Sequence, residues 1–156
     1  MCRLACRTLQ ILILLAVAST SLWARERQLS KNDLPVAVRK TADEQVQGAT
    51  VRGYSKEVEN GQIEYEVQLV ANGHSKDITI APDGRVLEIE EDVPMESLPV
   101  PVTSRLNAKA GKGRIAKVES LTKGGKVVAY EAQVVAAGKH SEIQVAPDGS
   151  DLIHPE

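Results

Sequence analysis

The sequence predicts an α+β protein made of two tandem units, each a helix followed by a four-stranded antiparallel sheet. The two sheets are expected to join into one curved sheet with the helices on one face. Three observations lead to this expectation. The second half of the chain repeats the first, each half opens with an apolar stripe at helical spacing, and the rest of each half alternates apolar and polar residues.

The duplication is visible when the chain is aligned with itself so that Gly48 lies over Gly113. Residues 48–87 then align with residues 113–152, and 14 of these 40 positions are identical. A repeat this long and present only twice indicates a duplicated small fold, because solenoids and propellers use shorter units in three or more copies. We therefore assign residues 30–93 to the first unit and residues 94–156 to the second.

Each unit begins with a helix signal. Pro35 and Pro99 suit a first helical position, where the missing N–H costs nothing. Apolar residues then recur at four-residue steps and form one narrow stripe in each unit. The stripe residues are Leu34, Val38 and Ala42 in the first unit and Leu98, Val102, Leu106 and Ala110 in the second.

The rest of each unit reads as strands separated by glycine-containing turns. The expected strands cover 50–58, 62–71, 76–81 and 85–90 in the first unit, and 115–121, 126–136, 141–146 and a stub at 151–153 in the second. Both third strands end in the turn sequence Ala-Pro-Asp-Gly, at Ala81–Gly84 and Ala146–Gly149, where the aspartate is expected to serve the turn. Tyr65 and Tyr130 fall on the apolar face and are expected in the core.

The N-terminal segment 1–24 has the three-part pattern of a secretory signal peptide. Two arginines and no acid precede the apolar stretch 11–18, which is too short to span a bilayer. Cleavage after Ala18 and cleavage after Ala24 both remain open. We expect a secreted or periplasmic chain without a stable membrane anchor after cleavage.

The composition excludes several function classes. Cys2 and Cys6 lie in the leader, so the mature chain has neither a disulfide nor a cysteine nucleophile. Without residues 1–24 the balance is 17 basic against 21 acidic residues, a net charge of −4. Nucleic acid is therefore not an expected partner, because its binding sites are basic and often aromatic.

The outward face of the sheet supplies the candidate partner-binding residues. Alternation along the second strand of each unit places polar side chains on the face opposite the tyrosines. They are Glu64, Glu66 and Gln68 in the first unit and Glu131 and Gln133 in the second. The alternative is that these residues only keep an exposed sheet face soluble.

Other candidate sites lack the required spacing. His74, His140 and His154 belong to no known metal-binding motif, so no metal and no cofactor is expected. The acidic run 88–92 lacks the pattern of a calcium loop, and we interpret it as a solvated strand edge. Ser55 and Ser120 match between the units but lie outside a G-x-S-x-G context, so no catalytic residue is expected.

The helix beginning at Leu-Pro-x-x-Val, the central Tyr-Glu and the closing Asp-Gly turn resemble the PepSY domain. In doubled form, over about residues 30–154, the chain is similar to secreted PepSY-like, β-lactamase-inhibitor-protein-like proteins. The resemblance implies an extracytoplasmic module that in some relatives inhibits secreted proteases or β-lactamases. It also implies binding through the exposed concave face of the sheet.

Together these features predict a non-enzymatic, monomeric protein-binding module with an unidentified secreted protein as partner, acting as an inhibitor of a secreted hydrolase. The alternative is an envelope sensor that binds a small ligand or ion, which would need a pocket with convergent polar groups.

Overall fold

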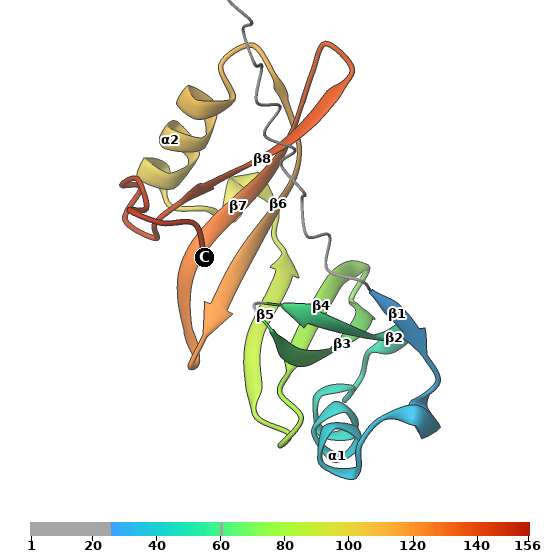
Figure 1. Cartoon of the computed structure of the whole chain (residues 1–156). Coiled ribbons are helices and arrows are strands. Elements are labelled where there is room, and N and C mark those ends of the chain that lie inside the picture. Colours follow the sequence, from blue (N-terminus) through green and yellow to red (C-terminus); the bar gives the residue numbers. More distant parts are fainter. Residues whose placement is uncertain (1–25, 60) are drawn as a thin grey trace, which may run out of the picture.

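The computed structural model of the protein describes residues 26–59 and 61–156, and the expected signal peptide at 1–24 lies outside these residues. The described chain forms one antiparallel sheet whose eight strands neighbour one another in sequence order (Figure 1). The strands are β1 (Arg27–Leu29), β2 (Thr50–Glu59), β3 (Gln62–Ala71), β4 (His74–Ile80), β5 (Val86–Asp92), β6 (Arg114–Lys123), β7 (Lys126–Ala136) and β8 (Lys139–Val145).

The two helices begin one residue after the prolines that predict them. α1 (Val36–Gln45) follows Pro35, and α2 (Val100–Ala110) follows Pro99. A short 3-10 turn precedes each helix, at Lys31–Asp33 and at Met95–Ser97. Among the described residues, no helix is both long and apolar enough to cross a bilayer.

Each helix covers its own part of the sheet and builds its own core. Val38 and Ala42 of α1 are fully buried, as are Val102 and Leu106 of α2. The core under α1 contains Leu34, Val38, Ala42, Tyr65, Val67, Leu69, Ile78 and Ile80. The core under α2 contains Leu98, Val102, Leu106, Val118, Ala132 and Val145, with Tyr130 packed against it. Both tyrosines therefore lie on the apolar face, as the alternation predicts.

The expected division into two helix-plus-four-strand units is wrong. The fourth strand of each unit precedes its helix and does not follow it. β1 pairs with β2 through Gln28 and Ser55, and β5 pairs with β6 through Glu91 and Ser120, where Ser55 and Ser120 are the matched serines of the repeat. The repeating order is therefore strand, 3-10 turn, helix and three strands, and β5 opens the second repeat while also pairing with β4.

The strand stub expected at 151–153 does not form, for two local reasons. Asp151 is bound by the side chains of Arg105 and Lys109 on α2, which hold the pKa of its carboxyl down at about 2. Pro155 has no N–H to donate to a sheet ladder. The equivalent positions of the first repeat are Val86 and Glu90, both in β5.

The acidic run 88–92 is also placed differently from the expectation of a solvated edge. It lies in β5, which has β4 on one side and β6 on the other, so it runs through the middle of the sheet. Because β5 joins the two parts of the sheet, its outward-facing acids lie where the sheet bends. The acidic motif itself did not indicate this position, because strand neighbours are decided by long-range pairing.

The two Ala-Pro-Asp-Gly turns have the same geometry and the same role. The Gly84 amide bonds to the Ala81 carbonyl oxygen at 2.8 Å, as Gly149 does to Ala146. Asp83 accepts the amide of Arg85 at 3.0 Å, and Asp148 accepts that of Ser150 at 2.9 Å. The expectation that both aspartates serve the turn is confirmed.

Candidate functional site

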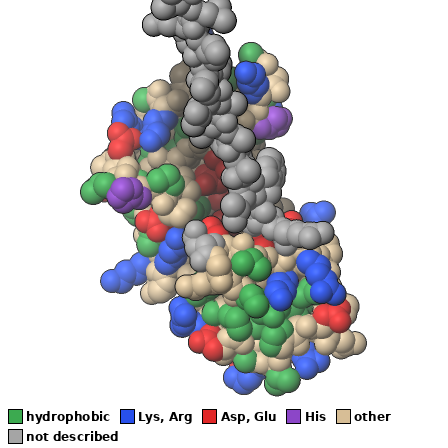
Figure 2. Space-filling view, in the orientation of Figure 1, with side chains coloured by type: hydrophobic (Ala, Val, Ile, Leu, Met, Phe, Trp, Pro, Cys, Tyr) green, Lys and Arg blue, Asp and Glu red, His purple; other side chains and the backbone are tan. Residues whose placement is uncertain are grey.

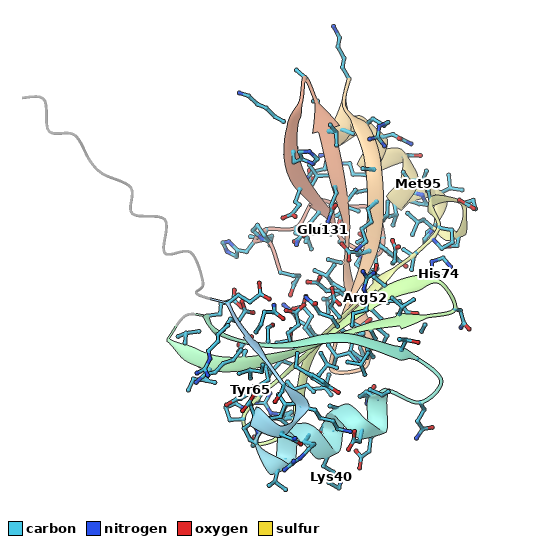
Figure 3. The ribbon with its side chains drawn as sticks, turned by 90° about the vertical axis from the view of Figure 1, so that its right-hand side faces the viewer. Lys40, Arg52, Tyr65, His74, Met95 and Glu131 are labelled. Atoms are coloured by element: carbon cyan, nitrogen blue, oxygen red, sulfur yellow. The ribbon has the colours of Figure 1, made fainter. Side chains whose placement is uncertain are left out.

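The sheet face opposite the helices is the candidate functional surface, and we call it the open face. Figure 3 shows α1 beneath one half of the sheet and α2 beside the other, with the sheet bent between them and Glu131 on the inside of the bend. The open face is therefore concave. Acidic side chains gather in the hollow between the two halves (Figure 2).

Three predicted residues lie together on β3 of the open face. Glu66 accepts a hydrogen bond from the buried Ser55 hydroxyl at 3.0 Å and another from the Gln68 amide at 3.3 Å. Glu64 lies directly opposite Glu57 of β2. Burial and neighbouring carboxylates raise the pKa of both Glu57 and Glu64.

The other two predicted residues lie on β7. Glu131 accepts a hydrogen bond from the Gln144 amide at 2.8 Å, and burial is the main cause of the raised pKa of its carboxyl. Gln133 lies between Lys117 of β6 and Glu142 of β8. The five predicted residues thus share the open face but form two groups, one on each side of the bend. Their partner-binding role stays a prediction.

Between the two groups lies a cluster that sequence reasoning missed. Asp77 of β4, Glu90 of β5 and Glu119 of β6 bring carboxylate oxygens within 4.8 Å of one another. Asp77 is directly opposite Glu90, and Glu119 is directly opposite Asp92, the next open-face residue along β5. We call these three residues the bend cluster. These three residues share no sequence motif. What they have in common is an open-face position, which can be recognised only once the strand register is known.

The bend cluster is short of positive charge. Glu119 is only 5% exposed, and the ammonium of Lys117 is 2.6 Å from one of its oxygens. Lys123 binds Glu88 at the edge of the cluster, at 3.1 Å. Like charges opposite one another destabilise a sheet, and burial adds to the cost. The cluster can therefore lower its energy by holding protons or by accepting a cationic group.

The carboxyl pKa values reflect this repulsion. Burial, together with the charges of Glu119 and Glu88, raises the pKa of Glu90 to about 8. Burial, followed by the charge of Glu66, raises the pKa of Asp77 to about 6. Both groups hold their protons more tightly in the folded chain than in the unfolded chain.

The contribution of these two groups to stability should consequently fall as the pH rises. For Glu90 the stabilising effect is complete below its ordinary pKa of 4.5 and is lost as the pH rises through about 8. A change of one in a pKa corresponds to about 1.4 kcal/mol, and solvent screening of this half-buried group reduces the total to something on the order of 2 kcal/mol. Glu90→Gln should remove this part of the pH dependence.

Urea unfolding of the wild type and of Glu90→Gln at pH 4, 6 and 8 measures the effect. The variant should be the more stable of the two at pH 8. The exposed Glu96→Gln is the matched control and should follow the wild-type profile. Parallel profiles for Glu90→Gln and the wild type would show that Glu90 does not carry the pH dependence.

The described residues contain two groups of carboxylates with the spacing of metal ligands: the bend cluster, and Glu57, Glu59 and Glu64 at the β2–β3 hairpin. In the bend cluster one Glu119 oxygen is already bound to Lys117. No histidine belongs to either group, and His74, His140 and His154 lie on the surface, at the start of β4, in β8 and in the C-terminal segment. The expectation of no metal stays a prediction.

Comparison with known proteins shows the fold class. No family matches the chain by sequence, and no curated protein does. A protein from Bacteroides eggerthii described as periplasmic has a TM-score of 0.63 and 18% identity, covering 76% of this chain and 86% of its own. A DUF2874 family protein from Bacteroides ovatus has a TM-score of 0.61 and 16% identity, covering 76% and 84%.

A BLIP-like protein from Bacteroides fragilis has a TM-score of 0.58 and 16% identity, covering 76% of this chain and 83% of its own. At these identities the likeness concerns the fold alone. It supports a BLIP-like fold, and none of these three proteins is described as a PepSY domain.

Proposed function

We propose that this chain is a secreted or periplasmic, non-enzymatic protein-binding module whose open face takes a basic segment of a partner protein. The observation that carries the proposal is the bend cluster. Three carboxylates from three neighbouring strands meet on a concave surface, and Lys117 is in direct contact with one of them, Glu119. A lysine or arginine side chain from a partner would relieve their mutual repulsion.

The surrounding surface supports a protein as the partner. The predicted residues of β3 and β7 extend the polar floor on both sides of the bend, over a span that a polypeptide segment can cover. Complementary charge of this kind mainly increases the rate of association and the selectivity for one partner over others. One structural neighbour is described as periplasmic, which supports the proposed location. Another is described as BLIP-like, which supports the more specific proposal of an inhibitor of a secreted protease or β-lactamase.

A single substitution separates binding from folding. Glu90→Lys places a cation inside the bend cluster, so it should raise the melting temperature while weakening partner binding at least about tenfold, by the loss of one buried charge pair. The exposed Glu96→Lys makes the same change in net charge away from the open face. It should bind the partner as the wild type does.

The experiment uses the mature chain immobilised against its native secreted or periplasmic fraction, together with inhibition assays on a panel of secreted proteases and β-lactamases. A partner captured by the wild type and Glu96→Lys but lost by Glu90→Lys supports the proposal. No captured protein and no inhibition across the panel would contradict it. A thermal shift with Ca²⁺ and no protein partner would favour the sensor alternative.

A further inference from the structure

The outer edge of β8 is left open at a place where the first repeat carries a strand. The register of the repeat superimposes β4 on β8, and β4 is paired on its outer side by β5. Within the described residues β8 pairs only with β7. The pairing of β5 with β4 in the first repeat therefore shows how a strand can bind to this edge.

The C-terminal residues lie beside the inner part of β8 and leave its outer part uncovered. Leu152, Pro155 and Glu156 line one hollow together with Glu142, Ile143 and Gln144. Asp151 is held by α2, and further along the Glu156 amide bonds to the Gln144 side-chain oxygen at 2.9 Å. The Glu156 carboxylate forms an ion pair with Lys123 on the open face. The segment from Lys139 to Glu142 stays exposed on the hairpin that projects from the body of the molecule in Figure 1.

The backbone of β8 is oriented to pair with another strand. The Ala146 amide points away from β7, since it bonds to the Ser150 carbonyl oxygen at 2.9 Å. Successive residues of a strand direct their N–H and C=O groups to alternate sides. The backbone groups of Gln144, Glu142 and His140 therefore face the outer edge.

The side chains along this edge define the chemistry of the occupant. Ile143 packs against the core under α2, and in the first repeat its counterpart Ile78 is opposite Ile89 of β5. The exposed Glu142 corresponds to Asp77, which is opposite Glu90. An acid at this position repels Glu142 and a base attracts it.

We propose that the outer edge of β8 accepts an extended segment of a partner protein as a ninth, antiparallel strand. This segment places a lysine or arginine opposite Glu142 and an apolar residue opposite Ile143, where it displaces the C-terminal residues 152–156. Strand addition of this kind takes its affinity from backbone hydrogen bonds and its selectivity from alternate side chains. The site adjoins the open face, where Glu142 lies opposite Gln133, but it contains no residue of the bend cluster and does not depend on the function proposed there.

The test uses two synthetic peptides based on residues 85–92, which contain β5 and the residue before it. One has the natural sequence, and the other carries the change Glu90→Lys. Titration of each into the ¹⁵N-labelled mature chain should move the backbone amide signals of His140, Glu142 and Gln144. The lysine peptide should bind about fivefold more tightly, as expected for one exposed cross-strand pair changed from repulsive to attractive.

Two variants of the protein make the assignment specific. Glu142→Lys should reverse the preference, so that the natural peptide binds the more tightly. Glu142→Pro removes an outward-facing N–H from an edge strand, where proline is tolerated, and should abolish binding of both peptides. Glu142→Lys keeps the backbone intact, so the proposal remains testable even if the proline variant does not fold.

Several results would overturn the proposal. They are no binding of either peptide, signal changes confined to β3 and β4 of the open face, and a peptide preference that Glu142→Lys leaves unchanged. Concentration-dependent self-association that Glu142→Pro abolishes would also overturn it, because the occupant would then be a second copy of this chain. None of these results depends on how the Glu90→Lys variant of the protein behaves in the open-face experiment, so the two proposals can fail separately.

Discussion

Replacing Gly149 with alanine should lower the free energy of unfolding by about 3 kcal/mol, by the sum of backbone strain and overpacking. Gly149 closes the second Ala-Pro-Asp-Gly turn with φ +83°, a conformation that costs an L-residue about 1–2 kcal/mol. A Cβ atom there would lie 2.6 Å from the backbone carbonyl carbon of Pro101 in the first turn of α2. Backbone atoms cannot move aside as a flexible side chain can.

Gly138 is the matched control for this substitution. It has a similar φ of +75°, but no atom lies within 4 Å of the position that a Cβ would take. Gly138→Ala should therefore cost about 1 kcal/mol, from backbone strain alone. Chemical denaturation of both variants gives the comparison. Equal losses would show that the contact between the turn and α2 contributes nothing.

Removing the ammonium of Lys117 should also destabilise the chain by about 3 kcal/mol, the lower end of what an unpaired buried charge costs. Lys117→Met keeps the aliphatic length of the side chain but leaves the buried Glu119 carboxylate without the cation 2.6 Å from it. The other two members of the bend cluster, Asp77 and Glu90, are both acids. The loss should be larger at pH 8 than at pH 5, since protonation of the cluster relieves the repulsion.

A double-mutant cycle isolates this ion pair. Lys117→Met combined with Glu119→Gln removes both charges and should recover more than half of the loss. Lys117→Arg keeps the charge and should cost little. If the double variant is as unstable as Lys117→Met alone, packing around the lysine stem and not the ion pair holds this part of the sheet together.

These experiments connect stability with the proposed function through one physical feature. The bend cluster is costly in the isolated chain, and Lys117 offsets only part of the cost. A partner that supplies a second cation would gain binding free energy from repulsion already present in the folded chain. Glu90→Lys is the corresponding intramolecular change, which is why the variant should be more stable and should bind less well.

The open face could be predicted in part from local pattern. Alternation assigns Glu64, Glu66 and Gln68 to one face of a strand and Tyr65 to the other, because successive side chains of a strand point to opposite sides. The same rule placed Glu131 and Gln133 on that face. It could not bring Asp77 and Glu119 together, since they are far apart in sequence and meet only through the pairing of β4 with β5 and of β5 with β6.

The wrong assignment of β5 to the first unit has a related cause. The Ala-Pro-Asp-Gly turn correctly joins β5 to β4, and this local signal suggested that β5 closes the first unit. The pairing of β5 with β6 crosses a helix and a linker, and no residue motif announces it. β1 was missed because so short a strand cannot show alternation.

By itself the sequence determined the elements of this protein: two proline-initiated helices with one apolar stripe each, the strands from β2 to β8, two aspartate-stabilised turns and the internal repeat. The elements and turns depend on neighbours within a few positions along the chain. The tertiary structure alone decided that β5 belongs to the second repeat and lies in the middle of the sheet, that three acids meet at the bend and that the edge of β8 is open. Each of these depends on which strands become neighbours, a choice made by burial and pairing over the whole chain.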